Sequence, residues 1–170
     1  MPKKKSAKKT KKAPKTEAKI KAKAAPPAPS AAKPAKGARL GPSLLVVESP
    51  AKERTISRFL KSEFVVKSSV GHVRDLPVRK IGVNVDDNFA PQYVVLPRAK
   101  KILAEFKTLV SKTAYVYLAT DHDREGESIA WHLVDMLRLK ADQVRRITFH
   151  EITPGAIREA ISQPRAIDEN

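Results

Sequence analysis

Residues 119–127, Ala-Thr-Asp-His-Asp-Arg-Glu-Gly-Glu, are the stretch that decides the fold of this chain. They follow a short apolar run, residues 114–118, and they lead into residues 124–138, whose apolar side chains recur at helical spacing. A strand is therefore predicted to end, and a helix to begin, at a group of acidic residues. In an open α/β sheet the ligand crevice lies outside the carboxyl ends of the strands. The stretch thus predicts an α/β fold with an acidic site at one edge of its sheet.

The acidic residues are spaced so that their side chains can converge. Asp121 and Asp123 are two residues apart, so an extended backbone directs both to one side, and Glu125 falls in the first helical turn. Crowded carboxylates repel one another unless a cation or a proton intervenes, and Mg²⁺ commonly binds one or two of them. An ordinary helix start explains the stretch about equally well, with Asp123 as N-cap and the glutamates offsetting the helix dipole. An EF-hand is excluded, because His132 stands where that loop needs a bidentate glutamate.

The rest of the sequence alternates between strand and helix patterns. Strands are predicted at residues 44–48, 64–67, 114–120 and 144–149, with a short edge strand at 93–96 inside an otherwise irregular segment, 78–97. Helices are predicted at residues 50–61, 98–110, 124–138 and 154–163. This alternation implies a mainly parallel sheet that is covered by helices on both faces.

A second acidic strand end lies at Glu48. If its strand neighbours the strand that precedes Asp121, the two carboxyl ends share one crevice and Glu48 joins the acidic group. Lys52 then follows one turn into the next helix, with its ammonium near the same rim. Taken singly, an ordinary strand-end acid and an exposed lysine are the better explanations of these two residues.

Other residue types point to structural roles. Tyr93, Tyr115 and Tyr117 are expected in the core, and His132 is expected to cap a helix face. The sequence contains neither of the two common glycine-rich phosphate loops, and it lacks a serine-nucleophile elbow and a zinc-protease motif. The absence of cysteine excludes disulfides, thiolate zinc sites and a cysteine nucleophile.

The positive charge is concentrated at the amino-terminal end. Residues 1–42 hold thirteen lysines and one arginine against a single acid, whereas residues 43–170 hold twenty basic and seventeen acidic residues. A Lys/Ala/Pro-rich segment without aromatic residues cannot bury enough apolar surface to order itself, so residues 1–42 are predicted to be a disordered basic tail. Such a tail attracts polyanions, nucleic acid above all, although a merely solubilising leader remains an alternative. Residues 43–170 suffice for one domain, and the sequence contains neither a secretory signal nor an apolar run of transmembrane length.

Three segments carry a family resemblance. Residues 47–52, 67–77 and 119–127 closely resemble the amino-terminal domain of the bacterial type IA topoisomerases, the DNA topoisomerase I family. Shorter runs at 129–132 and 149–153 extend the match in the same order. The resemblance implies that the folded part is a TOPRIM domain, a Rossmann-like α/β unit with a mainly parallel sheet.

The resemblance also implies roles for the residues at the strand ends. Asp121, Asp123 and Glu125 correspond to the family's acidic Mg²⁺ triad. Glu48 corresponds to a glutamate that lies beside the metal and transfers a proton to the leaving 3′ oxygen. Lys52 corresponds to a lysine near the scissile phosphate. The metal and the cations would offset charge on a phosphodiester while Glu48 supplies the proton.

Two more residues, the partner and the reaction follow from the same resemblance. His72 matches a DNA-contacting residue, and Arg124 is expected to help hold phosphate, as a catalytic and DNA-binding residue. Members of the family relax negatively supercoiled DNA by breaking one strand through a 5′-phosphotyrosine, passing the other strand and resealing, without ATP or another nucleotide cofactor. The expected partner is thus the single-stranded region of negatively supercoiled DNA, the expected state monomeric, and the expected location the cytoplasm, at the nucleoid and not at a membrane.

The nucleophilic tyrosine is not expected in this chain. None of the three tyrosines lies in a matching motif, so the chain is expected to be an amino-terminal fragment that is inactive alone. Two alternatives stay open: a TOPRIM nuclease or primase, against which the loop at residues 71–77 argues, and a non-catalytic nucleic-acid-binding module.

Overall fold

The computed structural model describes residues 42–168. The predicted disordered tail, residues 1–42, therefore lies outside the described residues, apart from Pro42.

Four parallel strands form the central sheet, in the order β2-β1-β7-β8. They are β1 (Ser43–Val47), β2 (Phe64–Ser68), β7 (Val116–Leu118) and β8 (Val144–Arg146). The predicted parallel sheet is confirmed, and its ladders are shorter at β7 and β8 than the predicted strands. Since β2 lies on one side of β1 and β7 on the other, the strand order reverses between β1 and β7. In such sheets ligands bind at this switch point.

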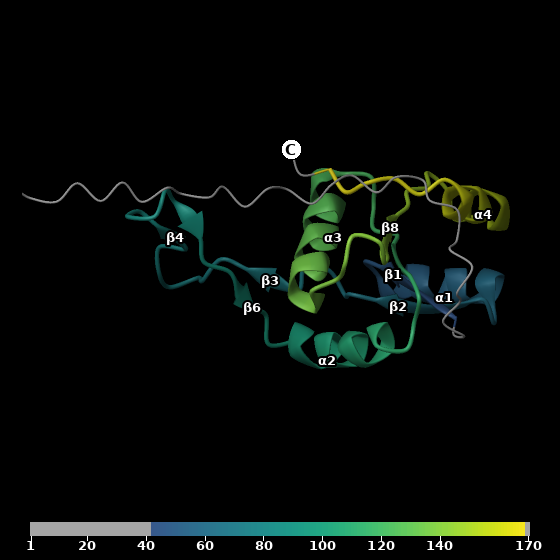
Figure 1. Ribbon diagram of the computed structural model, residues 1–170, viewed down its shortest axis with the longest axis horizontal. Helices are drawn as coiled ribbons and strands as arrows, with labels where there is room; N and C mark the ends of the chain where they lie inside the picture. The colour runs from purple at the N-terminus through teal and green to yellow at the C-terminus, as the bar shows by residue number, and fades with distance from the viewer. Residues whose placement is uncertain (1–41, 169–170) are drawn as a thin grey trace, which may run out of the picture.

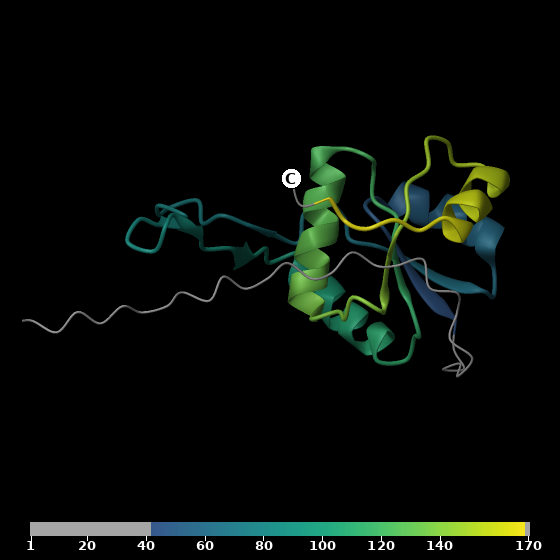
Figure 2. The ribbon, with the colours of Figure 1, turned by 45° about the horizontal axis from the view of Figure 1, so that its top comes forward.

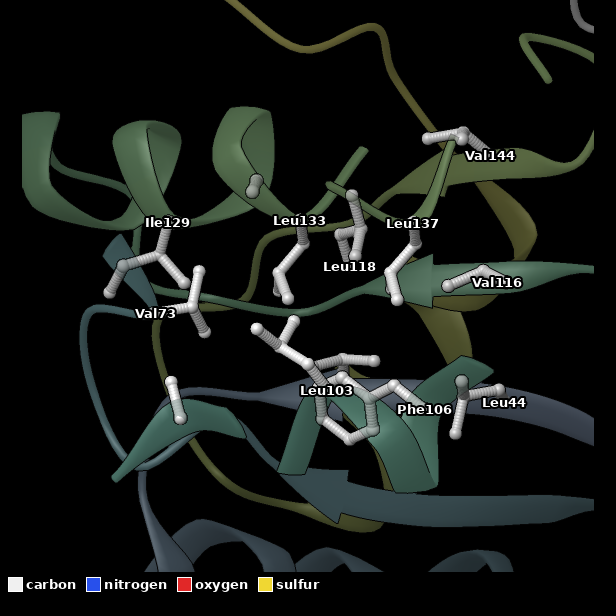
Figure 3. Packing of buried hydrophobic residues seen from close by; sticks show 13 residues of the cluster. Leu44, Val73, Leu103, Phe106, Val116, Leu118, Ile129, Leu133, Leu137 and Val144 are labelled. Atoms are coloured by element: carbon white, nitrogen blue, oxygen red, sulfur yellow. The ribbon is translucent and has the colours of Figure 1, made fainter. Parts of the chain in front are cut away.

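Helices cover both faces of the sheet (Figures 1 and 2). Helices α2 (Ala99–Val110) and α3 (Arg124–Leu137) lie on one face, and α1 (Pro50–Leu60) and α4 (Pro154–Ser162) on the other. Strand β1 supplies both layers, because Leu44 and Val46 join one apolar cluster while Leu45 and Val47 join the second. Figure 3 shows the first cluster, in which Leu103, Phe106 and Leu133 meet between the two helices and the sheet.

The segment between β2 and α2 projects from the sheet as a finger, residues 74–95 (Figures 1 and 2). Its two antiparallel pairs are β3 (Arg74–Asp75) with β6 (Val94–Val95), and β4 (Val83–Asn84) with β5 (Ala90–Pro91). The predicted edge strand therefore pairs with β3 and not with the central sheet. Strands of two residues that bury little apolar surface leave no periodicity to find in the sequence.

Two predictions about packing were wrong. Tyr93 is 37% exposed, and its ring lies against the guanidinium of Arg74 and the rings of Trp131 and His132, outside the apolar clusters. His132 does not cap a helix; it is buried within α3, where its Nδ1 accepts a hydrogen bond of 2.6 Å from Arg74 Nε. Burial, reinforced by the neighbouring Arg74 charge, lowers the pKa of His132 to about 4. Tyr115 and Tyr117 are half-buried at β7.

Within residues 42–168, no helix is both long and apolar enough to cross a membrane.

Candidate functional site

Glu48 and Asp121 meet where β1 and β7 end. The pairing of Val46 with Leu118 brings these carboxyl ends side by side. Glu48 Oε2 accepts a hydrogen bond of 3.1 Å from the backbone N–H of Asp121. Lys52 Nζ donates to Glu48 Oε1 and to Asp121 Oδ1, so one ammonium joins both acids. The structure thus brings together three of the predicted site residues at the switch point of the sheet.

The start of α1 places Lys52. Ser49 is the N-cap, and its hydroxyl accepts a hydrogen bond of 3.3 Å from the backbone N–H of Lys52, while Pro50 occupies the first turn. Because Glu48 precedes the cap, Lys52 stands four residues after it, one helical turn away. The local sequence, Glu-Ser-Pro-Ala-Lys, is therefore sufficient to bring Lys52 next to Glu48.

The pKa values of the three charged groups are shifted in different ways. Burial raises the pKa of Glu48, and a side-chain hydrogen bond with the Asp121 carboxyl adds to the rise, against the lowering effects of Lys52 and of the Asp121 backbone N–H. The same side-chain hydrogen bond, together with Lys52, lowers the pKa of Asp121. Burial works against the Lys52 ammonium, but its hydrogen bonds to Asp121 and Glu48 outweigh burial and raise its pKa. Glu48 is thus the member of the acid pair that takes up a proton more readily, and Asp121 is the member that stays ionised.

Asp123 and Glu125 lie at the start of α3, with other partners. Asp123 is the N-cap, and its Oδ1 accepts a hydrogen bond of 2.7 Å from the backbone N–H of Gly126. Glu125 is 63% exposed, and its carboxylate lies 3.2 Å from Nε2 of His72. The loop that carries His72 therefore lies beside the start of α3, next to the acidic stretch.

The turn between β7 and α3 is closed tightly around Gly126. Thr120 Oγ1 donates a hydrogen bond of 2.7 Å to the carbonyl oxygen of Gly126. A Cβ atom on Gly126 would lie 2.1 Å from the carbonyl oxygen of Asp121, closer than real contacts allow. Only glycine lets the helix start this near to the backbone of Asp121.

The donor set fits Mg²⁺ in its chemistry. Carboxylate oxygens are the ligands that Mg²⁺ uses, and those of Glu48 and Asp121 lie at the crevice edge with Asp123 two residues further on. Within the described residues, however, no three His, Asp or Glu side chains are grouped so that they could hold a metal ion. The Lys52 ammonium occupies the space between Glu48 and Asp121. The metal-binding role of Glu48, Asp121, Asp123 and Glu125 stays a prediction.

Arg124 lies apart from Lys52, in a cavity of about 490 Å³ beside the first turns of α3. The lining residues include Asp123, Trp131 and Arg165, but not Glu48, Lys52 or Asp121. Arg124 therefore shares this cavity with Asp123 and not with the group formed by Glu48, Lys52 and Asp121.

One residue at the site was not anticipated from the sequence. Arg146, in β8, is fully buried and donates hydrogen bonds to the carbonyl oxygens of Thr120 and Asp121 and to the carboxylate of Glu127. A signal existed, since Arg146 stands two residues after Val144 and so on the same face of a predicted strand. A basic side chain on a buried face needs buried acceptors.

Comparisons with known proteins identify the family of this chain. Residues 43–152 match the family described as the Toprim domain. The DNA topoisomerase 1 of Synechocystis sp. is 45% identical over 141 residues, which are 75% of this chain and 16% of that protein. The DNA topoisomerase 1 of Mycolicibacterium smegmatis is 47% identical over 139 residues, which are 74% of this chain and 15% of that protein.

A solved structure is similar as well. Full-length topoisomerase I from Thermotoga maritima superposes with a TM-score of 0.67 at 44% identity, over 74% of this chain and 21% of that one. The chain spans about a sixth of the length of the curated relatives that it matches, 16% and 15%. The predicted resemblance is confirmed: the chain belongs to the Toprim domain family, in the group represented by bacterial DNA topoisomerase I.

Proposed function

We propose that this chain forms the Mg²⁺-binding Toprim portion of a type IA DNA topoisomerase. The whole enzyme would relax negatively supercoiled DNA without ATP, by breaking one strand, passing the other and rejoining the break through a 5′-phosphotyrosine. The observation that carries this proposal is the meeting of Glu48, Lys52 and Asp121 at the switch point between β1 and β7. The similarity to DNA topoisomerase 1 from two bacteria supports it.

The chain's own residues divide the work at a phosphodiester. Glu48, whose pKa is raised chiefly by burial, is the acid of the pair that takes up a proton more readily, and it would give that proton to the leaving 3′ oxygen as a general acid. The Lys52 ammonium, released from the acid pair, lies near enough to offset charge on the phosphate oxygens. Asp121 remains ionised beside it, because its pKa is lowered. When bound by Asp121, Asp123 and Glu125 beside Glu48, Mg²⁺ would supply further positive charge at the phosphate.

Other residues would hold the DNA. His72, next to Glu125, faces the acidic stretch from the loop after β2, and we propose that it contacts the single strand. Arg124 would hold a phosphate in the cavity that it shares with Asp123. Within residues 42–168, Tyr115 and Tyr117 belong to β7 or its approach and Tyr93 to the finger. The nucleophilic tyrosine is therefore proposed to come from the part of the relatives that this chain does not match, and this chain alone is proposed to be inactive. The proposed location of the enzyme is the cytoplasm, at the nucleoid.

Calorimetric titration with Mg²⁺ tests the site directly. The double variant Asp121→Asn, Asp123→Asn should lose about tenfold or more in Mg²⁺ affinity, because it removes two anionic ligands. The matched control is Asp86→Asn, Asp87→Asn, which removes the same charge from the finger, away from the strand ends. Equal affinity in the wild type and the site variant would contradict the proposal. Hydrolysis of DNA by this chain alone would instead support a Toprim nuclease.

A further inference from the structure

A fully buried guanidinium lies directly beneath the turn that carries Asp121. Arg146 extends from β8 under the carboxyl end of β7, with no exposed surface. Its terminal nitrogens donate hydrogen bonds to three carbonyl oxygens in that turn, those of Leu118 (3.0 Å), Thr120 (2.8 Å) and Asp121 (2.7 Å). A fourth goes to the carbonyl of Ile147, at 2.6 Å. The backbone carbonyls at the end of β7 and just after it thus accept hydrogen bonds from one side chain of the neighbouring strand.

Arginine suits this position better than any other residue. Its planar group offers five N–H donors in a fixed arrangement, whereas a lysine at the same place offers three donors on a single atom. Nη1 bonds the carbonyls of Leu118, Thr120 and Ile147 while Nη2 bonds that of Asp121, and a single ammonium cannot occupy both places. Glu127, in the first turn of α3, supplies the opposite charge through its Oε1, 2.8 Å from Arg146 Nη2.

The backbone of Asp121 is consequently held from two sides. Its N–H donates to Glu48 Oε2 at 3.1 Å, and its carbonyl oxygen accepts from Arg146 Nη2 at 2.7 Å. On the side of α3 the carbonyl lies so near Gly126 that a Cβ atom there would stand 2.1 Å from it. With the peptide groups fixed, only the side-chain torsions of Asp121 remain to be set when a ligand binds.

We propose that Arg146 is a positioning residue for this site, which holds the Asp121 turn so that the carboxylate faces Glu48 and Lys52 before any ion binds. The proposal rests on the proposed function for its consequence, Mg²⁺ affinity, but not for its geometry. Residues that orient metal ligands from behind are worth about ten- to a hundredfold in affinity. Arg146 acts through the backbone of Asp121 and touches neither substrate nor ion.

The test compares Arg146→Lys with Arg145→Lys in the full chain. Both variants exchange arginine for lysine in β8, but Arg145 packs on the ring of Tyr115 and bonds the carbonyls of Asp142 and Val144. Titration with Mg²⁺ should show about a tenfold or greater loss of affinity for Arg146→Lys and none for Arg145→Lys. Amide hydrogen exchange without Mg²⁺ should be faster at Asp121 in Arg146→Lys, while the amides of β1 exchange as in the wild type.

Three results separate the possibilities. If Arg146→Lys lowers thermal stability but leaves Asp121 exchange and Mg²⁺ affinity as in the wild type, Arg146 is an ordinary core residue and the proposal is overturned. If the wild type itself binds no Mg²⁺, the proposed function fails, while the exchange at Asp121 still decides whether Arg146 holds the turn. If Arg146→Lys does not fold, the wild type provides the test: Mg²⁺ should shift the guanidinium NMR signals of Arg146 and not those of Arg145, and unshifted Arg146 signals would contradict the proposal.

Discussion

Glu127 shows how a residue in an acidic motif can serve the fold and not the site. Its Oε1 accepts from Arg146 and Arg165, and its Oε2 accepts a hydrogen bond of 3.1 Å from the backbone N–H of Asp168. Burial works to raise the pKa of Glu127, but the hydrogen bonds from Arg146 and Asp168 and the two arginine charges outweigh it and lower the pKa. Sequence spacing alone could not separate this acid from Asp121, because its partners come from β8 and from the segment after α4.

The pH dependence of stability follows from that lowered pKa. A carboxyl whose pKa is lower in the folded than in the unfolded chain stabilises the fold above its unfolded pKa, and this contribution is lost as the pH falls through the folded value. For Glu127 the loss occurs below its ordinary value of 4.5. Glu127→Gln should cost about 3 kcal/mol at neutral pH, because it leaves the buried Arg146 without an anionic partner.

Urea unfolding of wild type and Glu127→Gln between about pH 6 and about pH 3 measures this contribution. The gap between the two proteins should narrow as the pH falls, since wild-type Glu127 becomes neutral. The control is Glu105→Gln, which removes an exposed partner of Lys67 and should change stability by less than about 1 kcal/mol. A gap that stays constant over this range would contradict a lowered pKa of Glu127 in the folded protein.

At the scale of elements, the sequence predicts best what depends on neighbours in the chain. The start of α1 could be predicted, since Ser49 and Pro50 are local signals, and so could the apolar strands β1 and β2. The ion pair between Lys52 and Asp121 could be predicted only on the condition that β1 and β7 are neighbours, because local sequence patterns do not give the strand order. The burial of Arg146 has a signal in its place two residues after Val144, but its partners could not be predicted, because most of them are backbone carbonyls, which carry no sequence signal.

We expect the finger to contribute little to the stability of the domain. Its side chains Val78, Ile81 and Phe89 are exposed, and the apolar clusters take their residues from the sheet, the helices and the ends of the finger's connections, such as Val73 and Leu96. Replacing residues 77–92 with Asn-Gly keeps the register of β3 against β6, in which Asp75 faces Val94, and closes it with a two-residue turn.

The shortened protein should melt within a few degrees of the wild type, because no buried apolar residue is removed. It should also bind less of a dye that reports exposed apolar surface. Thermal unfolding followed by circular dichroism checks the first expectation and dye fluorescence the second. Loss of the cooperative transition would mean that the finger supports the sheet, contrary to the packing described here.

At the scale of the whole molecule, the described domain brings together the acids and the cation of the proposed phosphodiester site, and its relatives are several times longer. The switch point places Glu48, Lys52 and Asp121 at one edge, with His72 and Glu125 close to the same acidic stretch. The excess positive charge lies in residues 1–42, so the described part carries nearly balanced charge, and in the proposed function only local groups such as Lys52 would offset the charge of a phosphate.

The proposed metal site can be tested with a crystal of this protein soaked in Mn²⁺. This ion replaces Mg²⁺ at oxygen sites and is located by its anomalous scattering. If Asp121 and Asp123 hold the ion, a single strong peak should lie in contact with their carboxylates, with Glu48 beside it. The Lys52 ammonium should also have left its place between Glu48 and Asp121. Mn²⁺ bound only elsewhere, with Lys52 still joining those two acids, would contradict the proposed metal site.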